Sequence, residues 1–173
     1  NKEGELLEIN AKQFIEATEY GDLLALAGEE YSIGLESSVE TGEEWALNEE
    51  YPFIQDLTYI AILNDLGNGE DNLIDEPDDY NPEIFKCLCS EACDDHSKIN
   101  FMVCKKVLDY GKLPNHKYMI NWPNNGNDYF INILEMSREE RLKELEKAKN
   151  HTLALVYFMQ NEAQKRTQKP AKS

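Results

Sequence analysis

The sequence contains no apolar run close to the roughly 20 residues that a membrane-spanning helix needs, so no transmembrane segment is expected. Basic residues are scarce: 17 Lys and Arg stand against 34 Asp and Glu, which gives a formal net charge of −17. A surplus of this size repels nucleic-acid phosphates and anionic membranes, so neither is an expected partner. A signal peptide is also lacking, and the sequence predicts a soluble chain whose compartment it does not reveal.

The glycine fingerprint for dinucleotide binding is absent as well. The nearest candidate, Gly67-Asn68-Gly69, has Asn72 where the third glycine belongs. Glu70 and Asp71 would in addition repel a pyrophosphate. The chain therefore carries no such glycine cradle for a dinucleotide.

What is present is typical of one folded domain. The 173 residues are 41% hydrophobic and 10% aromatic, which is enough to bury a single core. We expect one domain over residues 1–173, with a frayed polar tail at 164–173. Because the chain opens on Asn1 and not on Met, we interpret it as an internal segment excised from a longer protein.

Alternating and helical patterns predict an α+β fold. Apolar runs favour strands within residues 1–18 and 99–103 and a central strand over 51–65. Helices are expected at 82–95, where Asn81 is a possible cap, at 105–110, and over a long stretch at 137–165. Ser137 and Glu140 form a capping box at the start of the long helix. The prediction is a largely antiparallel sheet packed against helices, including one long C-terminal helix.

The stretch 118–134 combines two apolar runs with a turn-forming segment between them. Two apolar runs flank six turn-forming residues, 123–128, which predicts a hairpin or a tight return loop. Trp122 directly precedes these six residues, and Tyr129 directly follows them. The local pattern fits either a well-made turn or a rigid polar loop that faces a ligand.

A second candidate site lies near the N-terminus. Gly21 and Asp22 open a predicted helix that ends at Gly28, and an apolar strand precedes them. The free N–H groups at such a helix start can bind a phosphate or another anion near Thr18. An ordinary strand–turn–helix capped by Asp22 is the alternative.

Four cysteines stand near one histidine. Buried free thiols are the favoured interpretation of Cys87, Cys89, Cys93 and Cys104. A disulfide stays open, and so does a zinc site that would include His96, although the spacing matches no zinc signature.

Several motifs occur in one order along the chain. They are Ile15-Glu16-Ala17-Thr18-x-x-Gly21-Asp22-Leu23-x-x-Leu26-Ala27-Gly28, Tyr31-x-x-Gly34-x-Glu36, Asn121-Trp122-Pro123-x-x-Gly126-Asn127-Asp128-Tyr129, Arg138-x-x-Arg141 and His151-Thr152-Leu153-x-x-x-Tyr157-Phe158-x-Gln160. Together they resemble a family of bacterial FAD-dependent oxidoreductases, which are two-dinucleotide-fold-like flavoproteins. The similarity runs from about residue 9 to about residue 160.

This resemblance implies a cofactor, a reaction and two groups of site residues. FAD would accept a hydride from an organic substrate. The residues implied to contact FAD are Ala17, Thr18, Gly21 and Asp22, and those implied to face flavin or substrate are Asn121, Trp122, Asn127, Asp128 and Tyr129. The family has Asp more often where Glu16 stands here.

The resemblance further implies an incomplete enzyme. The chain would be the substrate-side portion, and the remaining segments of its parent chain would be its partners and would supply the nucleotide-binding glycines. We therefore expect this portion alone to bind FAD weakly or not at all and to be inactive. The alternatives are a non-catalytic acidic interaction or scaffold domain and a small Cys/His metal-binding domain.

Overall fold

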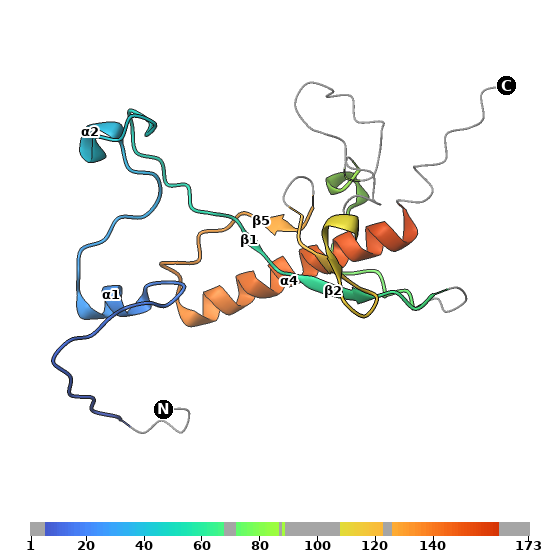
Figure 1. Cartoon of the computed structure of the whole chain (residues 1–173), viewed down its shortest axis with the longest axis horizontal. Helices are drawn as coiled ribbons and strands as arrows, with labels where there is room; N and C mark the ends of the chain where they lie inside the picture. The colour runs from blue at the N-terminus through green and yellow to red at the C-terminus, as the bar shows by residue number, and fades with distance from the viewer. Residues whose placement is uncertain (1–5, 68–71, 87, 89–107, 123–125, 163–173) are drawn as a thin grey trace. The chain divides into compact units, whose positions relative to one another are not determined.

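The computed structural model describes residues 6–67, 72–86, 88, 108–122 and 126–162. Contacts along the chain divide it into two compact units, residues 1–53 and residues 54–173 (Figure 1). We call them the first unit and the second unit, and each is described by itself. In the part of the chain that the structure describes, no helix has the length and apolar character needed to cross a bilayer.

The first unit is held by short-range hydrogen bonds. It contains helix α1 (Asp22–Ala27), helix α2 (Ser38–Thr41) and one antiparallel bridge between Leu35 and Tyr51. Gly34 makes that bridge possible, because its φ is 102° and a Cβ there would lie 2.2 Å from the Tyr51 carbonyl oxygen. No hydrophobic side chain is buried among the described residues of this unit.

The strands expected within residues 1–18 are not found where the structure describes this stretch, residues 6–18. Leu6 is 99% exposed and Ile15 is 85% exposed. A strand is stable only when a neighbour pairs with its backbone and covers one face. Neither condition is met here, so the prediction of strands in this segment is wrong.

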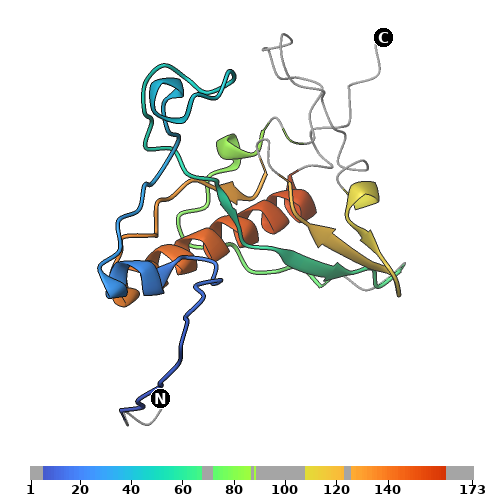
Figure 2. The same cartoon turned by 60° about the vertical axis from the view of Figure 1, so that its left-hand side comes forward.

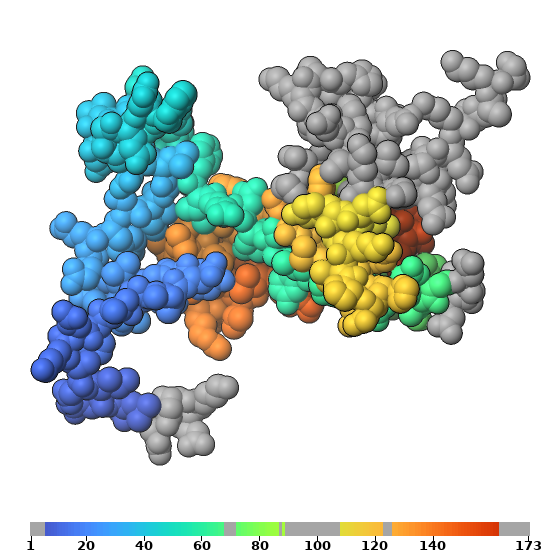
Figure 3. Space-filling model, viewed as in Figure 1, coloured from blue at the N-terminus to red at the C-terminus, as the bar shows by residue number. Residues whose placement is uncertain are grey.

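The second unit contains two small antiparallel sheets. In one, β1 (Leu57–Thr58) pairs with β5 (Asp128–Tyr129). In the other, the strand order is β2 (Ala61–Asn64), β4 (Lys117–Ile120) and β3 (Lys112–Leu113). Segments 57–67 and 108–122 lie side by side on the face shown in Figure 3.

The expected central strand at 51–65 is therefore wrong in two respects. It is broken into β1 and β2, which belong to different sheets, and β4 is the central strand. The break has a local cause at Tyr59. Its carbonyl accepts hydrogen bonds from the side chains of Asn127 and Thr152, so it is not available to a strand ladder.

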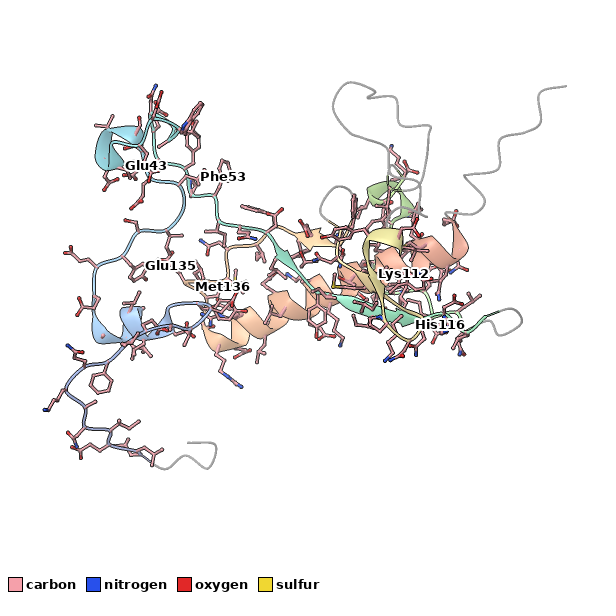
Figure 4. The ribbon with its side chains drawn as sticks, viewed as in Figure 1. Glu43, Phe53, Lys112, His116, Glu135 and Met136 are labelled. Carbon is pink, nitrogen blue, oxygen red and sulfur yellow. The ribbon has the colours of Figure 1, made fainter. Side chains whose placement is uncertain are left out.

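The three residues 114–116 form the turn that joins β3 to β4; Figure 4 labels His116 at the end of this turn and Lys112 at the start of β3. Asn115 and His116 both adopt positive φ, 60° and 55°. The His116 carbonyl accepts a hydrogen bond from the Asp65 N–H at 2.8 Å, which ties the turn to the end of β2.

The long helix α4 (Arg138–Asn161) confirms the predicted C-terminal helix and its capping box. The Ser137 hydroxyl accepts from the Glu140 N–H at 3.3 Å, and the Glu140 carboxylate accepts from the Ser137 N–H at 3.0 Å. The helix runs along the strands of the second unit in both views (Figure 2). Its C-terminal half enters the core, whose buried members are Phe85, Leu88, Ile120, Ala154, Leu155 and Phe158.

The other predicted helices are partly described. Residues 82–95 begin as a 3-10 helix, η1 (Pro82–Ile84), and the Asn81 side chain caps it by accepting from the Glu83 N–H at 3.0 Å. Residues 108–110 are helical, within the predicted helix at 105–110. The rest of both segments and the strand expected at 99–103 lie outside the described residues. All pairings within the described sheets are antiparallel, so the predicted α+β class is confirmed.

Candidate functional site

The return loop between β4 and β5 is closed by its own backbone. The Asn127 N–H donates to the Trp122 carbonyl oxygen at 3.0 Å. A Cβ at Gly126 would lie 2.0 Å from that same oxygen, so only glycine allows this approach. β4 and β5 pair with other strands and not with each other, so the tight return loop is the correct alternative of the two that the sequence allowed.

Asn127 fixes the loop to the rest of the second unit. Its side chain is fully buried. The amide oxygen accepts from the Trp122 N–H at 2.8 Å, and the amide nitrogen donates to the carbonyls of Tyr59 and Ile120, both at 3.1 Å. Thr152 Oγ1 lies 3.5 Å from the same nitrogen and donates to the Tyr59 carbonyl at 2.5 Å. The buried amide is satisfied within the protein and joins β4, the segment after β1, and α4.

His151 on α4 holds the loop from a second direction. Its Nε2 lies 3.1 Å from the Gly126 carbonyl oxygen. Because a carbonyl only accepts, Nε2 carries the proton. Burial lowers the pKa of His151, and the hydrogen bond to Gly126 offsets part of this shift. The neutral ring that burial favours leaves Nδ1 as an acceptor, and its faces pack against Phe85 at 5.1 Å and Tyr129 at 5.7 Å between ring centroids.

The remaining predicted loop residues are only partly covered. Asp128 accepts a hydrogen bond from the Thr58 hydroxyl, which fixes β5 against β1. The Trp122 ring is half-buried and packs edge-to-face on Tyr110 at 5.4 Å. Asn121 and Tyr129 are half-buried, so both keep surface that a ligand can contact.

The N-terminal candidate site has a different construction. Helix α1 begins at Asp22 and ends before Gly28, whose φ of 76° and backbone N–H close the helix as predicted. Its N-cap is Gly21, and Asp22 is the first residue of the helix, so Asp22 is not the cap. Ala17 and Thr18 precede this turn without regular secondary structure.

The anion position beside α1 is filled by a carboxylate of the chain. Glu16 accepts from the Thr18 N–H at 2.6 Å and from the Leu23 N–H at 2.8 Å. The pKa of Glu16 is lowered, chiefly by a hydrogen bond from the Thr18 side chain and then by these backbone N–H groups. In the described structure the two amides are therefore not available to a phosphate, which the Glu16 charge would also repel.

Sequence reasoning gave too little weight to three residues of this arrangement: Glu16, His151 and Thr152. Their types gave no signal, because their partners lie 7, 25 and 93 residues away along the chain. The departure of Glu16 from the expected Asp was the only local sign. Cys89, Cys93, Cys104 and His96 lie outside the described residues, as does Cys87. Among those that are described, no three His, Cys, Asp or Glu side chains gather as a metal site.

The family model described as FAD dependent oxidoreductase matches residues 1–172. No curated protein and no solved structure matches the chain.

Proposed function

The chain belongs to the FAD-dependent oxidoreductase family, and on that basis we propose that it is the substrate-side portion of such an enzyme. In this proposal the return loop lies against the flavin ring or its organic substrate. The remaining segments of the parent chain are its partners and hold most of the cofactor.

The observation that carries the proposal is that both described ends of the loop, Trp122 and Gly126–Asn127, are held by hydrogen bonds. Asn127 uses its amide oxygen and both amide hydrogens inside the second unit, and the Gly126 carbonyl accepts from His151. These loop ends are thus held without a ligand, which lowers the entropy cost of ordering them on binding. Because Asn121, Trp122 and Tyr129 remain partly exposed beside them, they are suited to orienting a planar ring.

The residues present suggest separate roles for the cofactor and for the protein. FAD, when bound, supplies the hydride acceptor for an organic substrate. The Asn121 amide can donate to and accept from a ring edge, and the aromatic side chains of Trp122 and Tyr129 can cover a ring face. We assign Asn127 and Asp128 to positioning, because Asn127 is fully buried and Asp128 is bonded to Thr58.

A phosphate cradle does not fit the α1 turn in the described structure. Glu16 occupies the Thr18 and Leu23 amides, so contact of Ala17, Thr18, Gly21 or Asp22 with FAD would use other atoms or a non-phosphate part of the cofactor. We therefore predict that this chain alone retains FAD weakly or not at all after dialysis and is inactive.

The test is an NMR titration of the isotopically labelled chain with FAD, FMN and ADP. FMN and FAD share the flavin ring, whereas ADP has only the nucleotide end. We expect FMN and FAD to shift the same signals of Asn121, Trp122 and Tyr129, and ADP to leave them unchanged. Shifts from ADP alone would overturn the placement of the loop, and tight stoichiometric retention of FAD would overturn the expected weak binding. A non-catalytic acidic interaction domain predicts no response of the loop to FMN.

A further inference from the structure

A cleft of about 580 Å³ opens beside the return loop within the second unit. It lies between α4, η1 with the residues before it, and β5. We call it the His151 cleft, and the lining residues that matter here are Asp78, Asp79, Phe85, Tyr129, Asn150 and His151. Its volume lies in the range of small-molecule sites.

The inner wall is aromatic. His151 contacts Phe85 and Tyr129 through its ring, and Phe85 is itself packed on Phe158 at 5.8 Å between centroids. Phe85 and Phe158 are fully buried, so the wall is anchored in the core. Such a wall favours a flat ring, which can stack or pack edge-to-face against it.

Several polar groups of the cleft can act as acceptors. His151 uses Nε2 on the Gly126 carbonyl, which leaves Nδ1 of the neutral ring as an acceptor. Asn150 uses its Nδ2 on the Asp78 carbonyl at 2.8 Å, which leaves its amide oxygen. The carboxylates of Asp78 and Asp79 add further acceptors. A ligand with several N–H donors matches this set.

The charges of the cleft favour a cation. Each lysine of the lining is paired on α4, Lys143 with Glu139 at 2.8 Å and Lys147 with Glu144 at 2.7 Å. The lining glutamate is also paired, Glu146 with Lys149 at 2.9 Å. Asp78 and Asp79 have no ion pair among the described residues, so the uncompensated charge of the lining is negative.

We propose that the His151 cleft binds a small planar aromatic cation that carries N–H donors, such as an aromatic amidine or amine. The ring lies against the His151 and Tyr129 side chains, and the cationic group is bound by Asp78, Asp79 and the neighbouring acceptors. This site shares Tyr129 with the surface that we propose faces the flavin, but binding of the cation does not require the cofactor.

Benzamidine, benzamide and benzoate test the proposal, since they share a ring and differ in charge. Each is titrated into the 173-residue chain while the imidazole nitrogens of His151 and the amide signals are followed by NMR. We expect the affinity order benzamidine, benzamide, benzoate, and a shift of His151 Nδ1 on binding of benzamidine.

Two variants and a control make the test specific. D78N and D79N should each weaken benzamidine about 2- to 5-fold, the size expected for an exposed charge pair, and leave benzamide unchanged. Asn tolerates the positive φ of 57° at position 79, so D79N should fold. D75N changes the net charge equally outside the cleft and should have no effect. Equal or tighter binding of benzoate, equal weakening by D75N, or no response at His151 to benzamidine would overturn the proposal.

Discussion

The two units of this chain are stabilised in different ways. In the second unit, α4 and the strands bury Phe85, Ile120 and Phe158, and a buried amide ties three segments together. In the first unit, the described residues bury only Ser37, and order comes from a bridge, two short helices and the hydrogen bonds of Glu16. Hydrogen bonds each add only about 0.5–1.5 kcal/mol, whereas a buried aromatic side chain adds several.

This difference bears on function. The loop that we propose to face the flavin belongs to the unit that has a core, and its described ends, Trp122 and Asn127, are hydrogen-bonded to each other without a ligand. The residues implied to contact FAD at α1 belong to a unit whose described part has no core of its own.

Truncation of a phenylalanine should have very different effects on stability in the two units. Phe158→Ala should lower the free energy of unfolding of the second unit by about 3–5 kcal/mol, because Phe158 is fully buried against Phe85. Phe14 in the first unit is 64% exposed, so Phe14→Ala should change the measured free energy of unfolding by less than about 0.5 kcal/mol. Urea unfolding followed by Trp122 fluorescence in a Trp45→Phe background measures both. Similar losses of unfolding free energy in the two variants would contradict the proposed difference between the units.

The buried amide of Asn127 should contribute more to stability than the half-buried amide of Asn121. Asn127→Leu leaves the Trp122 N–H without its acceptor and should cost about 2–4 kcal/mol. Asn121→Leu is the matched control, since its side chain makes no hydrogen bond in the described structure and is half-buried. It should cost less than about 0.5 kcal/mol. A similar cost for both variants would mean that Asn127 does not hold the loop.

Two serine caps compare the units directly. Ser137→Ala removes a capping box from α4 and should destabilise the second unit by about 1 kcal/mol. Ser37 caps α2 by accepting from the Glu40 N–H at 3.3 Å, but α2 has only four residues. Ser37→Ala should therefore leave the unfolding midpoint of the second unit unchanged. A shift of that midpoint as large as the one from Ser137→Ala would show that the units unfold together.

The smallest expected effect is the loss of the Glu16 hydrogen bonds at low pH. The folded pKa of Glu16 is lowered, so its hydrogen bonds to Thr18 and Leu23 are fully present above its ordinary value of 4.5 and are lost as the pH falls through the lowered value. The amide signals of Thr18 and Leu23 should move together below pH 4.5, and Glu16→Gln should abolish that transition. Movement already complete above pH 4.5 would contradict the assignment.

The sequence predicted features whose determinants lie within one turn of the chain. Gly28 ends α1, and Ser137 with Glu140 starts α4, because each signal acts on neighbouring backbone groups. The strands expected within residues 1–18, as far as the structure describes them, and the single strand expected at 51–65 are wrong because pairing depends on distant partners, such as Leu57 with Tyr129. The burial of Asn127 could not be read from the sequence for the same reason, since its carbonyl partner Tyr59 is 68 residues away.

The central claim is that the two described ends of the return loop, Trp122 and Asn127, are held together before any flavin binds. Native-state hydrogen exchange of the chain without cofactor tests it through the amides of Trp122 and Asn127, which are bonded to Asn127 Oδ1 and to the Trp122 carbonyl. We predict that both exchange only through global opening of the second unit, as slowly as the amides in the middle of α4, while the Thr18 and Leu23 amides exchange faster. Exchange of Trp122 and Asn127 at the rate of an unstructured peptide would contradict the claim.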